Sequence, residues 1–304
     1  MNETDHIDAM SGWPVGRVGY CTLLGRPNAG KSTLLNQALG YHLAAVSAKP
    51  QTTRRRWLGI LSEDESQLLF LDTPGVHRPR HALGEAMQRA IREAVDDADV
   101  LLCIADSTRP PGKEEALVAE AAAESGKPVF VALNKSDLTS SPEREAMAAF
   151  YRSRVAEARF FEISALRGEG VDALLAAMTQ ALPQGPFLFP PDQLTDSMER
   201  QIGAELIREA VMENLEQEVP HGVAVTIESW NESDRCRRIG AVVHVERKAH
   251  KCIVIGSAGR MIGRIRVSAE EKLAGISDVP VRLHIHVKVS RDWRRKPGIV
   301  RELA

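Results

Sequence analysis

Short apolar runs alternate with amphipathic stretches over the first two thirds of the chain. Each apolar run has the length of a β-strand, and the stretches between them repeat their apolar residues with a helical period. The strand candidates are residues 17–24, 67–71, 99–105, 128–133 and 159–163. The helix candidates are residues 33–39, 82–96, 113–125, 142–157 and 171–181. This alternation predicts an α/β fold with a mainly parallel sheet flanked by helices.

The pattern changes after Pro183. Residues 183–191 contain four prolines, which disfavour a helix, and we interpret them as a connector between domains. Beyond them, Glu199–Val289 has the order helix, strand, strand, helix, GxxG, helix, strand, which predicts an α+β domain. The pieces are helices at 198–217 and 260–274, strands at 223–227, 239–245 and 281–289, and an apolar run at 252–255.

Two domains agree with the length of 304 residues, since a domain averages roughly 150 residues. The predicted division is an N-terminal extension at 1–14, a first domain at 15–185, a proline-rich linker at 186–197, a second domain at 198–296 and a short tail at 297–304.

Composition excludes several classes of protein. The chain is 43% hydrophobic and 26% charged, which is ordinary for a globular protein and unlike collagen or a disordered tail. No apolar run approaches the roughly 18 residues of a membrane span. Residues 1–10 contain three acidic side chains and no Lys or Arg, which is unlike a secretory signal. We therefore expect a cytoplasmic protein.

The cysteines agree with a reducing compartment. None of them has the CxxC spacing of a metal or redox site, and we expect buried, reduced thiols. They are Cys21, Cys103, Cys236 and Cys252.

Charge is distributed unevenly along the chain. The net charge is −2 overall, but it is −5 over residues 1–192, −8 over 193–234 and +11 over 235–304. A basic block on an acidic protein favours an anionic partner, with nucleic acid first and an acidic membrane surface second. A solvated charged face is the alternative that charge alone leaves open.

A phosphate-binding loop follows the first predicted strand. Residues 25–32 fit the pattern GxxxxGK[ST] between a strand and a helix. Glycines let successive N–H groups face the phosphates, Lys31 reaches the terminal phosphates and Ser32 is a magnesium ligand. The residues expected at the nucleotide are Gly25, Arg26, Pro27, Asn28, Ala29, Gly30, Lys31, Ser32 and Thr33.

Three further motifs follow later strands in the order typical of GTPases. Asp72 can hold magnesium through water, and the Gly75 amide can sense the terminal phosphate. Asp137 can accept both N1–H and N2–H of guanine, donors that adenine lacks. The residues expected at GTP are Asp72, Thr73, Pro74, Gly75, Asn134, Lys135, Asp137, Ser164, Ala165 and Leu166. All four motifs lie at strand ends, where doubly wound sheets bind ligands.

Catalysis and metal binding have their own candidates. Residues 49–54 resemble a switch segment, and Thr53, with Thr52 as the alternative, is expected to bind magnesium in the triphosphate state. The predicted magnesium ligands are Ser32, Thr53 and Asp72, and Lys31, Thr53 and Gly75 are catalytic candidates. Val76 stands where a Ras-type enzyme has glutamine, so hydrolysis is slow or is assisted by another group.

With these motifs the chain resembles the Era family, which are bacterial GTPases with a C-terminal KH domain. The resemblance covers about residues 15–295. It is carried by 25–36, 49–56, 72–77, 134–137 and 164–166, and in the second part by 190–196, 204–210, 218–225, 253–265 and 287–294.

The resemblance implies a type II KH domain, a module that grips about four nucleotides with its GxxG loop. It further implies a GTP-dependent switch that binds the 3′ end of 16S ribosomal RNA and assists small-subunit assembly and rRNA processing. Asn28 matches an asparagine that holds K+ in potassium-stimulated relatives, so Asn28 and K+ join the catalytic hypothesis beside Mg2+. RNA contacts are expected from Lys248, Lys251, Gly256, Ser257, Ala258, Gly259, Arg260, Arg264, Arg266, Trp293 and Arg294.

The chain departs from the family in two places. Ser257 and Ala258 lie between the loop glycines where KH domains usually have a lysine or another polar residue, and Gly263 replaces the usual lysine. Trp293 lies among basic residues, and base stacking and packing at the domain edge are equally compatible with that position.

Three alternatives accompany the main interpretation. A membrane-surface GTPase would use the basic block on anionic lipid, a contact at the inner face of the cell membrane. An RNA-binding module with a vestigial nucleotide domain is disfavoured by the intact motifs, and a tRNA-modification GTPase by the residues after Pro190. We expect a monomer that binds GTP, GDP and the small ribosomal subunit.

Overall fold

A computed structural model describes residues 13–47, 53–54, 56–76, 82–216, 219–233, 235–296 and 300. Thr52, most of the predicted extension, most of the predicted tail and parts of the segments 49–56 and 72–77 lie outside these residues. The chain forms two compact units. The first comprises Met1–Tyr41, Arg55–His77 and Gln88–Asp196, and the second comprises His42–Arg54, Arg78–Met87 and Ser197–Ala304.

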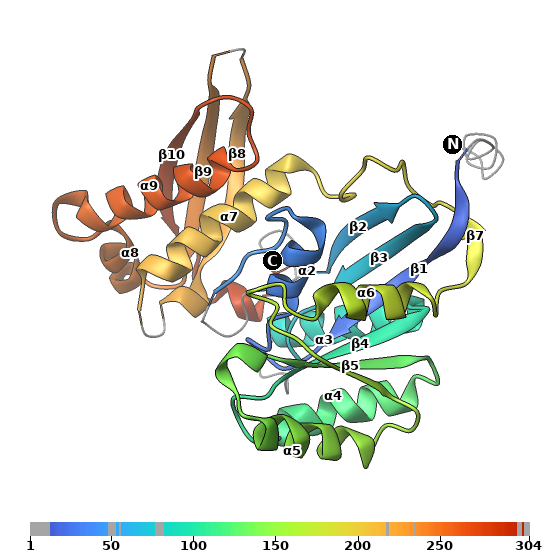
Figure 1. Ribbon diagram of the computed structural model, residues 1–304. Coiled ribbons are helices and arrows are strands. Elements are labelled where there is room, and N and C mark those ends of the chain that lie inside the picture. Colours follow the sequence, from blue (N-terminus) through green and yellow to red (C-terminus); the bar gives the residue numbers. More distant parts are fainter. Residues whose placement is uncertain are drawn as a thin grey trace. The chain divides into compact units, whose positions relative to one another are not determined.

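The first unit is built on a mainly parallel sheet (Figure 1). Its strand order is β2-β3-β1-β4-β5-β6, β2 runs antiparallel to β3, and β7 pairs antiparallel with β1. The strands are β1 Val15–Leu24, β2 Trp57–Glu63, β3 Ser66–Asp72, β4 Val100–Asp106, β5 Val129–Asn134, β6 Arg159–Glu162 and β7 Gln184–Pro186. The predicted α/β fold is confirmed, although the sequence analysis predicted neither β2 nor β7.

Helices cover both faces of this sheet, with α4 and α5 on one side and α2 and α6 on the other (Figure 1). The helices are α2 Lys31–Leu39, α3 Ala82–Asp97, α4 Lys113–Glu124, α5 Ser141–Arg152 and α6 Val171–Thr179, with a short 3-10 helix at Ser136–Leu138. Apolar side chains of β4 and β5 pack against Ile91, Val118 and Met147 of the helices. Burial of this apolar area is the main stabilising term for the sheet.

The proline-rich stretch lies along the first unit. Gln67 accepts hydrogen bonds from the N–H groups of Leu188 (2.8 Å) and Phe189 (3.0 Å). Farther along, Ile60 N–H donates to Leu194 O (2.8 Å) and Thr195 Oγ1 donates to Leu58 O (2.6 Å). Most of the segment interpreted as a connector therefore belongs to the first unit.

The second unit contains a three-stranded sheet in the order β10-β9-β8. Its elements are α7 Glu199–Asn214, β8 Ala224–Asn231, β9 Arg237–Val245, α8 Lys248–Ile255, α9 Arg260–Ala274 and β10 Val281–Val289, with short 3-10 helices at Pro220–Gly222, Ser257–Gly259 and Trp293–Arg295. Strands β9 and β10 are parallel, and β8 runs antiparallel to β9. The predicted order of elements is confirmed, and the apolar run at 252–255 is the end of α8.

Two segments from the first half of the sequence also belong to the second unit. His42 Nε2 lies 3.1 Å from Glu209 Oε2 of α7, and Arg54 Nη1 donates to Val223 O at 2.5 Å. Leu83 and Met87 form a buried cluster with Trp293. These segments flank the DTPG motif, residues 72–75, in the sequence. The predicted domain bounds therefore do not follow the division into compact units.

The cysteines differ from expectation in their exposure. All four are free thiols, but only Cys21 and Cys103 are buried, whereas Cys236 is half-buried and Cys252 is exposed. Burial raises the pKa of Cys21 and of Cys103 well above the usual thiol range. The expectation of buried thiols is therefore wrong for Cys252, because it lies on an exposed position of α8.

Candidate functional site

The phosphate-binding loop connects the end of β1 to the start of α2. Asn28 (φ 63°) and Gly30 (φ 103°) both have left-handed backbone conformations, which turn the chain so that α2 begins at Lys31. A Cβ atom at Gly30 would lie 2.3 Å from Nδ2 of Asn134. Glycine is required there by both its backbone angle and the lack of space, and the loop presents the helix N-terminus to an anion.

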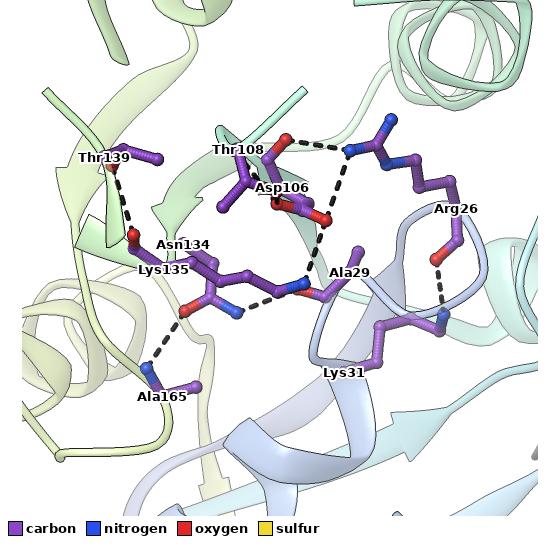
Figure 2. Close-up of polar contacts among 9 residues, drawn as sticks. All are labelled: Arg26, Ala29, Lys31, Asp106, Thr108, Asn134, Lys135, Thr139 and Ala165. Carbon is purple, nitrogen blue, oxygen red and sulfur yellow. Dashed lines mark hydrogen bonds and ion pairs between the residues drawn. The ribbon is translucent and has the colours of Figure 1, made fainter. Parts of the chain in front are cut away.

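Lys31 lies folded over the loop. Its ammonium donates to the carbonyl oxygens of Gly25 (3.2 Å) and Arg26 (3.3 Å), and Figure 2 shows the second contact. Burial lowers the pKa of Lys31, while the carboxylates of Asp72 and Glu115 oppose that shift. A terminal phosphate would offer this ammonium a full negative charge in place of two neutral carbonyls.

Two of the three predicted magnesium ligands lie together. Ser32 Oγ donates to Asp72 Oδ2 at 2.8 Å, which joins the start of α2 to the end of β3. A hydroxyl beside a carboxylate fits Mg2+, which prefers few protein oxygens together with phosphate oxygens and water. Thr53 is buried and belongs to the second compact unit. Among the described residues there is no group of three or more His, Cys, Asp or Glu suited to a metal.

The DTPG motif and the residue after it contact the phosphate-binding loop. Val76 N–H donates to Gly25 O at 3.0 Å, and a Cβ at Gly75 would lie 2.7 Å from Pro27 N. Thr73 Oγ1 donates to Leu23 O at 2.6 Å. The Val76 side chain is 5% exposed and packs in the core beside β4 and β5. Val76 is therefore a packing residue that cannot orient a water molecule.

The guanine-recognition motif, residues 134–137, is connected to the phosphate-binding loop by Asn134 (Figure 2). Its Nδ2 donates to Ala29 O at 2.8 Å, and its Oδ1 accepts from the N–H of Ala165 at 3.0 Å. Both ends of this buried amide are therefore engaged, and Asn134 holds three loops together. Asp137 lies near the exposed Arg167, whose Nε is 3.6 Å from Asp137 Oδ2. Leu166 is exposed.

A further acidic residue, which is not among the predicted site residues, lies at the same edge. Asp106 ends β4 and is buried, and Oδ2 of its carboxylate lies 3.2 Å from Nη2 of Arg26 and 2.9 Å from Nζ of Lys135. The signal that identifies Asp72 also applies here, since Asp106 is the polar residue directly after the predicted strand 99–105.

Glu115 is also not among the predicted site residues. It is fully buried in α4, and neither of its carboxylate oxygens has a hydrogen-bond partner among the described residues. Burial raises the pKa of Glu115 to about 7, and the nearby Asp106 and Glu114 add to the shift while Arg26 and Lys31 oppose it. No sequence signal distinguishes Glu115 from its neighbour Glu114, because the packing of α4 decides which of the two residues is buried.

The GxxG loop of the second unit connects α8 to α9. Gly256 (φ 74°), Ala258 (φ 52°) and Gly259 (φ 75°) have left-handed backbones. A Cβ at Gly256 would lie 2.6 Å from Cβ of Met261, whereas a Cβ at Gly259 would meet nothing within 4 Å. Gly256 is therefore required by internal packing, and Gly259 borders open space.

Basic side chains surround this loop. Lys248, Arg260, Arg264 and Arg266 are exposed, as are Ser257 and Ala258, and Lys251 is half-buried. Arg266 Nη1 lies 2.8 Å from Glu270 Oε2 one helical turn away. The predicted RNA-contacting residues of α8 and α9 thus lie on one continuous helix–loop–helix element.

Trp293, a predicted RNA contact, is buried inside the second unit. Its ring is fully buried with Leu83 and Met87, its Nε1 donates to Gly222 O at 2.9 Å, and the Arg54 guanidinium lies 5.4 Å from its centroid. A ring in this position cannot stack on a base, so packing is the correct interpretation. The adjacent Arg294 pairs with Glu246 through Nη2 at 2.5 Å, and its contact with RNA stays a prediction.

Two family models match the chain. One, described as a 50S ribosome-binding GTPase, matches residues 20–135, and one described as a KH domain matches residues 218–294. GTPase Era of Ruminiclostridium cellulolyticum is 37% identical over 286 residues, which are 94% of this chain and 96% of that protein. GTPase Era of Clostridium acetobutylicum is 39% identical over 285 residues, with the same coverage.

Solved structures of high similarity cover almost the whole chain. A variant of Aquifex aeolicus Era bound to GDP and AlF4− has a TM-score of 0.89, 35% identity, and coverage of 95% of this chain and 99% of that chain. Era in complex with MgGDPNP and nucleotides 1506–1542 of 16S ribosomal RNA has a TM-score of 0.89, 34% identity and the same coverage.

Proposed function

Because the chain belongs to the Era family of GTPases, we propose that it is a GTP-controlled switch that binds the 3′ end of 16S ribosomal RNA and assists small-subunit assembly and rRNA processing. The chain is a GTPase with a KH domain. One relative was solved with nucleotides of 16S ribosomal RNA, and the exposed basic side chains around Gly259 are the observation that carries the same proposal for this chain.

The nucleotide site supports hydrolysis by positioning and charge stabilisation. Water attacks the γ-phosphorus, the bond to the β–γ bridging oxygen breaks, and the water proton passes to the released phosphate. Lys31 exchanges its carbonyl partners for the β- and γ-phosphates, and Ser32 with Asp72 holds Mg2+, which neutralises phosphate charge. No described side chain at this edge is placed to act as a general base, and Val76 is packed in the core, so we expect slow intrinsic turnover.

Potassium is a second cation in this proposal. Asn28 lies in the phosphate-binding loop with φ 63°, and its side chain would help to hold K+ against the phosphates, where a positive charge stabilises the transition state. We expect faster GTP hydrolysis in potassium buffer than in sodium buffer of equal ionic strength. An Asn28→Ala variant should lose the difference, and equal rates for the parent protein in both buffers would contradict the role of K+.

The switch proposal is supported by contacts inside the second unit. Thr53, the candidate magnesium ligand, lies between His42 and Arg54 in the sequence and in the same unit as α7. His42 contacts Glu209, and Arg54 contacts Val223 O. A ligand that orders Thr53 therefore acts on a segment that belongs to the same unit as the KH domain. Order–disorder changes of such segments are how γ-phosphate switches transmit their state.

RNA binding in the two nucleotide states tests the proposal. The purified protein is titrated with a short RNA that matches the 16S 3′ end, once with a nonhydrolysable GTP analogue and once with GDP. We expect tight binding with the analogue and weak binding with GDP. Arg264→Glu should weaken binding, and the matched control Arg152→Glu on the exposed surface of α5 should not. Absence of RNA binding in protein that hydrolyses GTP would overturn the RNA assignment.

The membrane-surface alternative is tested by flotation with anionic vesicles. None of the described helices is long and apolar enough to cross a bilayer. Binding of the protein to vesicles but not to the RNA would favour the alternative. A cytoplasmic location and a monomeric state remain predictions, to be measured by cell fractionation and by light scattering.

A further inference from the structure

An ion network centred on a buried carboxylate joins the phosphate-binding loop to the guanine-recognition motif. At its centre is Asp106, whose Oδ2 lies 3.2 Å from Arg26 Nη2 and 2.9 Å from Lys135 Nζ. Figure 2 shows the two cations approaching this carboxylate from separate loops. Arg26 comes from the loop before α2, and Lys135 follows β5. Asp106 is therefore a bridge between two segments that are distant in sequence.

The Asp106 carboxylate is held in one orientation. Its Oδ1 accepts hydrogen bonds from Thr108 Oγ1 (2.6 Å) and Thr108 N–H (3.0 Å), and Arg26 Nη2 also donates to Asp106 O (3.0 Å). Burial alone would raise the pKa of Asp106, but hydrogen bonds from Thr108 and Lys135 bring it below its usual value. The carboxylate is thus ionised and has little rotational freedom.

The Arg26–Asp106 half of the bridge is shielded from water. The side chains of Arg26 and Asp106 are 10% and 5% exposed, whereas that of Lys135 is 30% exposed. Removing one partner of a buried ion pair leaves an uncompensated charge, so such pairs resist separation more than surface pairs do. Lys135 is also held by its backbone, since its φ is 64° and its carbonyl accepts from Thr139 Oγ1 at 3.1 Å.

We propose that Asp106 is a positioning residue that couples the phosphate and guanine halves of the nucleotide site, so that bound nucleotide is released only when both halves open together. This inference rests on the proposed nucleotide contacts of Lys31, Lys135 and Asp137. Asp106 is not among the residues assigned to the nucleotide. It acts by holding two side chains at one carboxylate: Arg26 of the phosphate-binding loop and Lys135 of the guanine-recognition motif. Because Asp137 belongs to the same motif as Lys135, this contact keeps Asp137 aimed at the base.

The mechanism predicts slow release of nucleotide. If Lys135 were free to move, the guanine motif could separate from the base while the phosphates stayed bound, and release would proceed in two easy steps. With the bridge intact, the base contacts and phosphate contacts must be lost together. The bridge therefore lowers the dissociation rate and leaves the association rate unchanged.

The experiment measures release of fluorescently labelled GDP from the full-length protein after mixing with excess GDP. Asp106→Asn keeps the shape and removes the charge, and we expect release to be about tenfold faster, the effect of losing a charge-assisted hydrogen-bond partner. The rate is measured on molecules that hold nucleotide, so a smaller folded fraction does not change it. The matched control Glu145→Gln removes an exposed ion pair with Arg152 (2.6 Å) and should leave release unchanged.

A double variant tests whether Arg26 acts through Asp106. Arg26→Met alone should speed release, but Arg26→Met combined with Asp106→Asn should release nucleotide at about the rate of the faster single variant. Multiplied effects would show that the two residues act independently and would overturn the bridge. Thr108→Ala keeps both ion pairs and the backbone N–H bond to Asp106 Oδ1 but removes the hydroxyl bond to that oxygen. It should therefore give a smaller increase of about threefold.

The outcomes separate this inference from the nucleotide site on which it rests. Asp137→Asn should weaken GDP binding because its amide cannot accept from both guanine donors. An unchanged release rate in Asp106→Asn and in Thr108→Ala, with the expected loss in Asp137→Asn, would overturn the bridge alone. An unchanged affinity in Asp137→Asn would overturn the assignment of the guanine site.

Discussion

Each of the two ligand-binding loops of this molecule has a glycine with a left-handed backbone before a helix, but the space around the glycine differs between them. Gly30 precedes α2 with φ 103°, and Gly259 precedes α9 with φ 75°. A side chain at Gly30 would lie 2.3 Å from Asn134, whereas one at Gly259 would meet nothing within 4 Å. The nucleotide loop is thus fixed by the protein's own contacts, and the GxxG loop keeps open space beside it. The turn at Gly30 is therefore held by contacts within the protein, whereas the position of Gly259 leaves room for a ligand to approach the loop.

The largest expected effect tests the packed loop. Gly30→Ala places a Cβ against Asn134 Nδ2 and adds the cost of a left-handed alanine, about 1–2 kcal/mol. We expect nucleotide affinity to fall by on the order of a hundredfold or more, measured by titration with fluorescent GDP. Gly40→Ala is the control, since Gly40 has φ 60° with nothing within 4 Å of its Cβ position. Gly40 lies at the other end of α2, so equal losses in both variants would mean that general destabilisation by a left-handed alanine, and not contact with Asn134, accounts for the effect.

The buried carboxyl of Glu115 tests how strongly burial in the first unit changes the pKa of a side chain compared with an exposed position. The pKa of Glu115 is about 7 when folded and 4.5 for an ordinary glutamate. Its stabilising contribution is therefore full below pH 4.5 and is lost as the pH rises through 7. Glutamine does not titrate, so the Glu115→Gln variant does not lose this contribution. Relative to the parent protein, its free energy of unfolding should therefore rise by on the order of 2–3 kcal/mol from pH 5 to pH 8.

Urea denaturation at the two pH values measures this difference. Glu145→Gln on the exposed face of α5 serves as the control and should follow the parent protein at both pH values. A constant difference between Glu115→Gln and the parent across this range would show that Glu115 does not titrate in the folded protein.

A smaller effect is expected at the open loop. Gly259→Ala has room for its methyl group, so only the left-handed backbone costs free energy, about 1–2 kcal/mol. RNA affinity should fall by about tenfold, while GTP hydrolysis stays unchanged, as measured by filter binding and phosphate release. A collapse of GTP hydrolysis in this variant would contradict the separation between the two loops.

The smallest effect concerns the helix that follows the open loop. Arg266 is exposed and pairs with Glu270 at 2.8 Å, and such surface pairs contribute about 0–1 kcal/mol to stability. Arg266→Ala should leave the unfolding free energy nearly unchanged but lower the slope of log Kd against log salt by about one, the sign of one lost phosphate contact. An unchanged slope would remove Arg266 from the RNA surface.

The sequence could predict those parts of the site in which a functional residue lies at the end of a buried strand. Asp72 and Asn134 end buried strands, and so does Asp106, which the same rule could have identified. The short strand β7 lacks such a signal, because three residues that include a proline have no periodicity and pair only where β1 is already placed. For Trp293, basic neighbours favour stacking and packing equally. Its burial depends on Leu83 and Met87, which are far away in the sequence.

The unequal exposure of the four thiols gives the molecule a built-in labelling position. Cys21 and Cys103 are buried with raised pKa values, while Cys252 is exposed on α8, one turn before Gly256. Alkylating reagents need an accessible thiolate, so a maleimide dye attaches first at Cys252, with the half-buried Cys236 next. A Cys236→Ser variant would therefore carry a single dye beside the GxxG loop and report an arriving RNA by its fluorescence, without any introduced cysteine.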